Sequence, residues 1–220
     1  MEKLPKINII YEDNHLLVVE KPVNIPVQED SSKDIDMITL LKDYRKVHEN
    51  KKGDAYLGLV HRLDRPVGGV MVFAKTSKAA SRLSEQVRNN TIHKTYIAVV
   101  EGTLPTRGKF EDYLVKDSKE NKSYVTTKDK GKYSSLEYEV LKEKDNLSLV
   151  KINLITGRSH QIRVQFSSRN HPLVGDSKYN NPNNINIALF AIELSIIHPI
   201  TKERLIFTLD IPNRYPFNIF

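Results

Sequence analysis

Short stretches with the composition and alternation of β-strands make up much of this chain, while three other stretches repeat their apolar residues at helical spacing. The predicted strands span residues 7–11, 16–19, 69–74, 91–100, 123–127, 136–142, 147–155, 187–197 and 205–211. Most of these strands follow one another directly, without a regular alternation of strand and helix. The pattern therefore predicts an α+β fold, with a largely antiparallel mixed sheet flanked by a few helices.

Three helices are predicted, each behind a residue type that can cap a first turn. The candidate N-caps are Asp34 or Asp36, Thr76 or Ser77, and Ser159. The helices behind them extend to about residues 49, 88 and 168. The buried positions predicted for the first two helices are Met37, Leu40, Leu41, Tyr44 and Val47, followed by Ala79, Ala80, Leu83 and Val87. Such stripes indicate that one side of each helix is buried.

Composition places the chain among ordinary globular proteins, because 39% of its 220 residues are hydrophobic and 28% are charged. We expect a single domain over residues 1–220. The absence of cysteine excludes disulfides and thiolate metal sites. The first six residues lack the apolar region of a signal peptide, and the longest near-apolar run, 185–197, is interrupted by Asn186, Glu193 and Ser195. We therefore expect a cytoplasmic protein with no membrane span.

Charge is distributed unevenly along the sequence, although its net value is +7. Residues 1–60 carry 9 basic and 11 acidic side chains, whereas residues 61–220 carry 25 basic and 16 acidic ones. Between residues 61 and 100 the ratio is seven to two. This excess indicates a polyanionic partner near that region, or else a solvated basic face.

The most unusual local pattern is residues 61–69, His-Arg-Leu-Asp-Arg-Pro-Val-Gly-Gly. Asp64 lies between two arginines, whose charges favour its ionised form. The proline and glycines predict a sharp turn that leads into the strand expected at 69–74. Asp64 is thereby a candidate nucleophile or acid–base group at the mouth of a strand, although a surface ion pair explains an isolated aspartate equally simply.

A second unusual stretch is residues 157–163, Gly-Arg-Ser-His-Gln-Ile-Arg. If Ser159 caps a helix, His160 and Arg163 share one face of it at a spacing of three. The free N–H groups at the helix start, together with Arg158, also suit a phosphate. The alternative is an ordinary arginine on a helix surface. Tyr96, in the strand predicted at 91–100, is either a core aromatic or a ring on which a base stacks.

Together these segments resemble the RluA-like family of RNA pseudouridine synthases, and the resemblance extends over essentially the whole chain. Residues 11–22 resemble the opening strand and turn of the family, and residues 61–64 its catalytic motif. Lys94-Thr95-Tyr96 is similar to its tyrosine motif. Residues 157–163, followed by His-Pro-Leu-Val-Gly-Asp at 171–176, resemble its C-terminal signature.

The resemblance implies the pseudouridine synthase fold and an aspartate-dependent isomerisation of uridine in ribosomal or transfer RNA, with base flipping. It makes Asp64 the catalytic aspartate, Tyr96 the active-site tyrosine against the target base, and Arg163 the cation paired with Asp64. The RNA contacts expected beside them are Arg62, His61, Arg65, Arg158, His160, Gln161 and Lys94. The reaction uses no cofactor, and we expect no metal because His61, His160, His171 and His198 lack zinc-ligand spacing. We also expect a monomer.

The sequence departs from the family at Val67-Gly68, where Thr-Ser is the commoner pair. We expect no separate N-terminal RNA-binding domain, since the first motif begins at about residue 7. Whether Asp64 attacks the sugar at C1′ or assists removal of a sugar proton stays open. Two other functions also stay open: a non-catalytic RNA-binding or RNA chaperone protein that uses the same basic groove, and a hydrolase with Asp64 as nucleophile.

Overall fold

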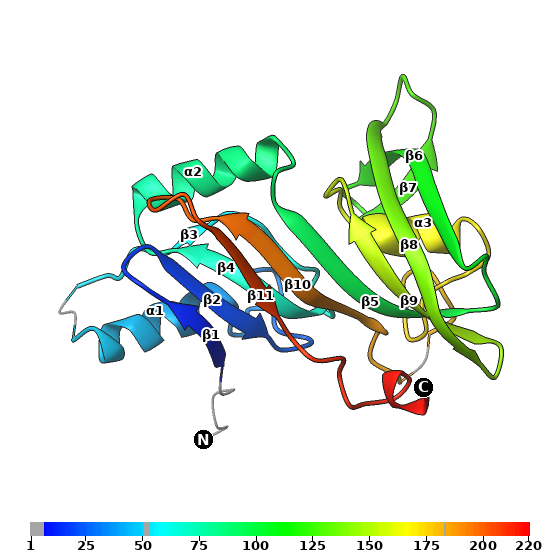
Figure 1. Cartoon of the computed structure of the whole chain (residues 1–220), viewed down its shortest axis with the longest axis horizontal. Helices are drawn as coiled ribbons and strands as arrows, with labels where there is room; N and C mark the ends of the chain where they lie inside the picture. The colour runs from blue at the N-terminus through cyan, green and yellow to red at the C-terminus, as the bar shows by residue number, and fades with distance from the viewer. Residues whose placement is uncertain (1–6, 51–52, 183) are drawn as a thin grey trace. The chain divides into compact units, whose positions relative to one another are not determined.

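The computed structural model describes residues 7–50, 53–182 and 184–220 (Figure 1). In that part of the chain there are eleven β-strands, three α-helices and one short 3₁₀ helix. The chain packs into two compact units, one of residues 1–92 with 194–209 and one of residues 93–193 with 210–220. A single domain over residues 1–220 therefore stays a prediction. The first six residues, where we expected no signal peptide, lie outside the described part.

The first unit contains a small sheet in the order β1, β2, β4, β10, with β3 paired to β4 and β11 paired to β10. Its strands are β1 (Asn8–Glu12), β2 (Leu16–Lys21), β3 (Gly58–Leu59), β4 (Gly68–Ala74), β11 (Arg204–Thr208) and the last residues of β10 (Leu189–Ile197). The ladders β1–β2, β2–β4 and β3–β4 are antiparallel. Every residue of β4 is buried, as are nearly all those of β2, so these two strands form the centre of this unit's core.

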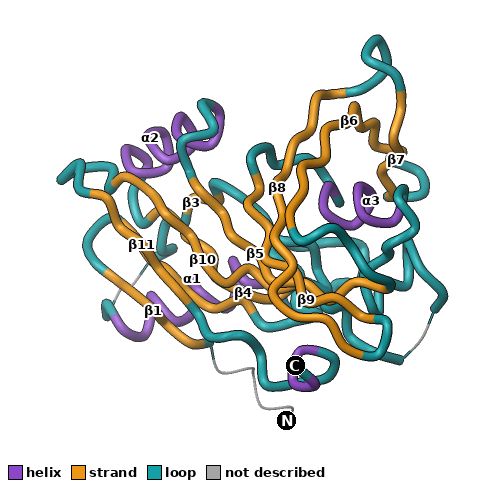
Figure 2. Tube along the Cα trace, turned by 45° about the vertical axis from the view of Figure 1, so that its right-hand side comes forward, coloured by secondary structure: helices purple, strands orange, loops and turns teal. Residues whose placement is uncertain are grey.

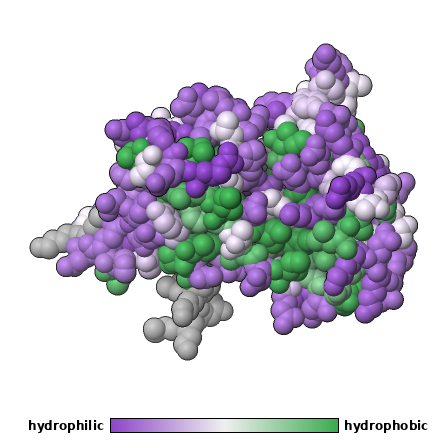
Figure 3. Space-filling model, viewed as in Figure 1, coloured by the Kyte–Doolittle hydropathy of each residue, from purple (hydrophilic) through white to green (hydrophobic). Residues whose placement is uncertain are grey.

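Two helices belong to this unit, and both begin where capping chemistry predicted. The carboxylate of Asp36 accepts a hydrogen bond of 3.1 Å from the backbone N–H of the third residue beyond it, and α1 (Met37–His48) follows. The hydroxyl of Thr76 accepts one of 3.2 Å in the same way, ahead of α2 (Ser77–Arg88). Helix α2 packs on β3 and β4, and hydrophilic side chains cover its outer side (Figure 3).

The predicted apolar stripe of α1 is wrong at its last position. Val47 is 85% exposed, whereas Arg45 is 2% exposed. Arg45 lies four residues beyond the fully buried Leu41, so it continues the buried side of the helix. Its guanidinium donates to both carboxylate oxygens of Glu49 at 2.8 and 2.9 Å, which offsets the cost of burying the charge.

The second unit contains a longer sheet in the order β10, β5, β9, β8, β6, β7. Its strands are β5 (His93–Glu101), β6 (Arg107–Asp117), β7 (Lys122–Thr126), β8 (Lys132–Lys144), β9 (Leu147–Leu154) and the first residues of β10, and its helices are α3 (Gln161–Ser167) and the 3₁₀ helix η1 (Phe217–Ile219). The ladders β5–β9, β8–β9, β6–β8 and β6–β7 are all antiparallel.

Helix α3 packs against β6 and β7 and covers one face of this sheet (Figure 2). Phe166 of α3 lies with its ring centre 5.0 Å from that of Phe110 on β6 and 5.7 Å from that of Tyr138 on β8. These three buried rings form an aromatic core under the helix. The α+β fold with a largely antiparallel sheet and a few helices is thereby confirmed.

Strand β6 was not predicted, and its surroundings explain why. On its outer face Arg107 pairs with Glu139 of β8 at 2.6 Å, and Lys109 pairs with Glu111 at 3.0 Å. Its inner face carries only two buried apolar residues, Phe110 and Leu114. Charged pairs on a solvent face replace the usual β-forming residues there, so the strand lacks a clear sequence signal.

Candidate active site

Asp64 lies half-buried in the loop between β3 and β4, in the first unit. The predicted turn is present: the N–H of Val67 donates to the Asp64 carbonyl at 2.9 Å, and Gly69 has a φ of 125°, which strongly favours glycine. Leu63 and Val67 are buried on either side of the carboxylate. The loop is therefore anchored in the core on both sides of Asp64.

Lys21, at the end of β2, holds the same loop through hydrogen bonds to backbone carbonyls. Its side chain is fully buried, and its ammonium group donates to the carbonyls of Pro22, Arg65 and Val67 at 2.9, 2.9 and 2.8 Å. All three of its protons are thus used. Burial lowers the pKa of Lys21 from 10.5 to about 7, the negative charge of Asp64 acts to raise it, and the charge of Arg65 acts to lower it. A lysine therefore connects the base of the Asp64 loop to the core.

The two arginines that flank Asp64 have different surroundings. Arg65 donates to the carboxylate of Asp34, to the Ser32 hydroxyl at 2.9 Å and to the Asn24 carbonyl at 3.2 Å. Arg62 is exposed, and within the described residues its guanidinium has no hydrogen-bond or ion-pair partner. Of the pair, Arg62 is the cation that is available for an incoming anion.

His61 contributes to the structure of the loop. It is 8% exposed, and its Nε2 accepts a hydrogen bond of 3.1 Å from the N–H of Val72 in β4. This bond fixes the first residue of the Asp64 stretch to the central strand. The contact gives His61 a structural role, and the RNA contact expected of it stays a prediction.

Tyr96 and Lys94 lie in β5, in the second unit, on the same face of the strand because they are two residues apart. Tyr96 is 7% exposed. Lys94 is half-buried, and burial lowers the pKa of its ammonium group. No hydrogen-bond or ion-pair partner for Lys94 occurs in the described ranges. Its Nζ is 3.4 Å from the point where a Cβ on Gly157 would lie, so the glycine leaves room beside the cation.

The start of α3 differs from the prediction. Ser159 is not its N-cap: the helix begins at Gln161, and His160 before it has a left-handed φ of 53° and makes no capping bond with its side chain. His160 also precedes the helix, so the predicted shared face with Arg163 is wrong. Its Nδ1 is 3.0 Å from the hydroxyl of Tyr179. The buried ring of His160 thereby holds the loop before α3 rather than facing outward.

Gln161 is 2% exposed, and protein groups use its whole amide. Its nitrogen donates to the Ser135 carbonyl at 3.0 Å and to Gln165 Oε1 at 3.1 Å. Its oxygen accepts from the Thr156 hydroxyl at 2.8 Å and from the Arg158 N–H at 3.0 Å. With all four positions taken, Gln161 has a structural role, and the RNA contact expected of it stays a prediction. The side chain of Arg158 is exposed, and its Nε donates to the Tyr133 carbonyl at 3.0 Å.

Arg163 lies in α3, is 4% exposed, and pairs with Asp176. Its Nε and Nη2 donate to the two carboxylate oxygens of Asp176 at 2.8 and 2.6 Å. Sequence reasoning gave Arg163 only Asp64 as a partner. Because Asp64 belongs to the first unit and Arg163 to the second, their pairing stays a prediction.

Lys21 and Asp176 are the two residues that sequence reasoning missed, although each lay in a motif that it quoted. The signal for Lys21 was a lysine at the end of an apolar strand, directly before proline. No comparable signal marked Asp176, because its partner lies thirteen positions earlier in another element.

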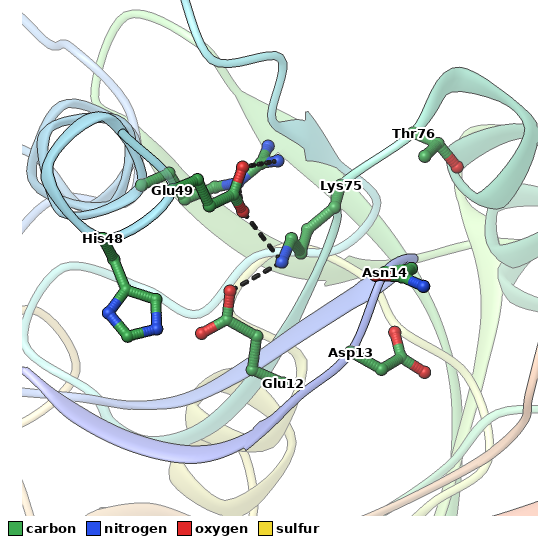
Figure 4. A pocket seen from close by; sticks show the side chains of 8 residues that line it. Glu12, Asp13, Asn14, His48, Glu49, Lys75 and Thr76 are labelled. Atoms are coloured by element: carbon green, nitrogen blue, oxygen red, sulfur yellow. Dashed lines mark hydrogen bonds and ion pairs between the residues drawn. The ribbon is translucent and has the colours of Figure 1, made fainter. Parts of the chain in front are cut away.

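Neither of two hollows found in the structure is lined by a predicted site residue. The first, of about 410 Å³ in the first unit, holds Lys75 at 2.6 Å from Glu12 and 2.8 Å from Glu49 (Figure 4). These charges satisfy one another and join β1, α1 and β4. Within the described residues there is no group of three potential metal ligands, and no helix is long and apolar enough to cross a membrane.

Comparison with known proteins supports the resemblance. A family model described as RNA pseudouridylate synthase matches residues 15–168. Ribosomal large subunit pseudouridine synthase C of Buchnera aphidicola is 35% identical in a match that covers 91% of this chain and 65% of that protein. Synthase D of Neisseria meningitidis serogroup B is 33% identical over 94% of this chain and 59% of its own length. The chain thus spans less than two thirds of either relative.

A similar fold occurs in the structure of human RNA pseudouridylate synthase domain containing 4, with a TM-score of 0.81 and 24% identity. The match covers 96% of this chain and 91% of the human one. The family model covers well over half of the residues, including the Asp64 loop, Tyr96 and Arg163. The chain therefore belongs to the RNA pseudouridylate synthase family.

Proposed function

We propose that this protein is an RNA pseudouridine synthase that isomerises specific uridines of ribosomal RNA. The observation that carries the proposal is the half-buried Asp64 in a loop fixed by the buried ammonium group of Lys21. Such anchoring is what a reacting carboxylate needs if it is to meet its substrate in a defined position. The ribosomal substrate is inferred from the relatives, two of which are named for the ribosomal large subunit.

The proposed reaction breaks the bond from C1′ to N1 of uridine, turns the uracil, and forms a bond from C1′ to C5. The proton on C5 leaves and N1 gains one, so atoms balance without an oxidant, a reductant or a cofactor. Asp64 either adds to C1′ or accepts a proton from the sugar. In this proposal Tyr96 lies against the extruded base, and Arg163 pairs with Asp64.

The RNA contacts that we propose come from cations that the described protein does not neutralise. Arg62 and Lys94 have no partner in the described residues, and Arg158 is exposed. The target base must leave its stack, which costs a few kcal/mol, and contacts of these cations with flanking phosphates offset that cost. Burial lowers the pKa of Lys94, and the negative charge of a bound phosphate should raise that pKa again and so favour the ammonium form. Action on ribosomal RNA would place the protein in the cytoplasm.

The test is an assay of unmodified ribosomal RNA with the purified protein, in which a chemical label at pseudouridine stops reverse transcription. Wild-type protein should produce stops at defined uridines, and Asp64→Asn should produce none while it still binds the RNA. Asp54→Asn, at an exposed residue of the same unit, is the matched control and should act as wild type. An active Asp64→Asn variant would overturn the role of Asp64, and RNA binding by an inactive wild type would favour the non-catalytic alternative.

A further inference from the structure

We propose that Asp176 is a positioning residue that fixes the orientation of Arg163 for the reaction. This inference rests on the proposed function. The C-terminal signature contains Asp176, yet neither the resemblance nor the chemistry above gave that residue a task. Its contacts in the second unit supply one.

The contact between the two side chains is a deeply buried ion pair. The side chain of Arg163 is 4% exposed and that of Asp176 is 0% exposed. Two parallel hydrogen bonds of 2.8 and 2.6 Å connect the Nε and Nη2 edge of the guanidinium to the carboxylate. This bidentate geometry restricts rotation of the guanidinium as well as its position.

Asp176 is itself fixed by the backbone that follows it. Its Oδ1 also accepts hydrogen bonds from the N–H groups of Lys178 at 3.0 Å and Tyr179 at 3.3 Å. The carboxylate therefore cannot turn away from Arg163 without losing contacts with its own loop. Breaking a pair that is buried to this degree leaves a buried charge without its partner, and this cost stabilises the arrangement.

Tyr179 restrains the guanidinium from a second direction. The Cζ of Arg163 is 5.3 Å from the centre of the Tyr179 ring, within the range of a cation–π contact. The hydroxyl of Tyr179 accepts from the N–H of Ser123 in β7 at 2.7 Å and donates to its carbonyl at 3.1 Å. Arg163 is thus held along one edge by Asp176 and over one face by a tyrosine that is attached to the sheet.

Two consequences follow for any second carboxylate that meets Arg163. Asp176 occupies Nε and one proton of Nη2, so a second carboxylate has to approach the side that bears Nη1. The Arg163–Asp176 pair is also formally neutral, so the arginine brings directed N–H donors rather than an excess of charge. Orientation is then what Asp176 supplies, and orientation affects the chemical step more than RNA binding.

The experiment compares kcat and KM of wild type, Asp176→Asn and Asp112→Asn on ribosomal RNA. Asp112 is the matched control, because its carboxylate pairs with Arg169 just beyond the same helix at 2.9 and 3.1 Å. Asp176→Asn should lower kcat by about 10- to 100-fold, because a small misplacement of a positioned group can cost that much, and leave KM within about twofold of wild type. Asp112→Asn should change neither constant.

Equal kcat values for Asp176→Asn and Asp112→Asn, with an active wild type, would overturn the inference. An inactive wild type would instead remove the proposed function, and the inference with it. If Asp176→Asn does not fold, Asp176→Glu is the second test. Its longer side chain keeps the negative charge but shifts the guanidinium of Arg163, so kcat should fall with little change in KM. Full activity of Asp176→Glu would then overturn the inference.

Discussion

Replacing Lys21 by methionine tests whether burial beneath the Asp64 loop lowers the pKa of its ammonium group. Methionine has similar bulk but no donor and no charge. A lysine with a pKa of 10.5 in the unfolded chain and about 7 in the folded protein keeps its proton longer when unfolded. The unfolded state therefore binds more protons between these two pH values, and the stability of the folded state rises as pH increases through that range.

The size of this rise follows from the two pKa values. The difference between 10.5 and about 7 corresponds to at most about 5 kcal/mol, at about 1.4 kcal/mol for each factor of ten. The contribution is fully developed above pH 10.5 and absent below pH 7. The three carbonyl contacts of Lys21 favour the ammonium form and act against the shift, so the observed rise should lie below that bound.

The measurement is the free energy of unfolding in urea at several pH values between 7 and 10.5. Other groups titrate in this range, so the informative quantity is the difference between wild type and Lys21→Met. The stability of wild type should rise with pH by more than that of the variant. Lys178→Met is the matched control, because Lys178 also donates to two backbone carbonyls but at an exposed site. Parallel curves for wild type and Lys21→Met would refute the reasoning.

Two further predictions concern the RNA contact and the fold. Arg62→Gln should weaken RNA binding and lower the slope of log Kd against log salt concentration by about 1. Arg65→Gln should change that slope less, because protein groups already bind Arg65. Filter binding at several salt concentrations measures both slopes. Asp36→Ala should lower the free energy of unfolding in urea by about 1 kcal/mol through loss of the α1 cap, and Asp34→Ala by less, because its pair with Arg65 is exposed. A larger loss for Asp34→Ala would contradict the assignment of the cap.

The sequence was most informative where one local rule acted alone. The caps of α1 and α2 and the buried run of β4 depend on neighbouring residues, and each was predicted within a few positions. β6 was missed because charged residues on its solvent face take the place of the β-forming residues by which a strand is recognised. The start of α3 was misplaced because the left-handed backbone at His160, rather than a serine side chain, precedes the helix.

The candidate site shows the same limit at the level of side chains. Asp64 and its turn were evident from six adjacent residues. The contacts that hold the loop connect Lys21 to carbonyls more than forty positions away, and no periodic pattern predicts such a pairing. His61 and Gln161 lie in the correct motifs, yet their roles depend on which backbone groups are nearby, which only the fold establishes.

The saturated amide of Gln161 limits which amino acids can replace it. Glutamate has the same shape but presents two acceptors, so the Ser135 carbonyl would face a negative oxygen instead of a proton. Leucine fills the space but removes the partner of Gln165 Oε1 and of the Arg158 N–H. Asparagine is one methylene too short to span the same groups. Few amino acids can therefore replace Gln161, and its contacts within the protein are enough to account for that restriction.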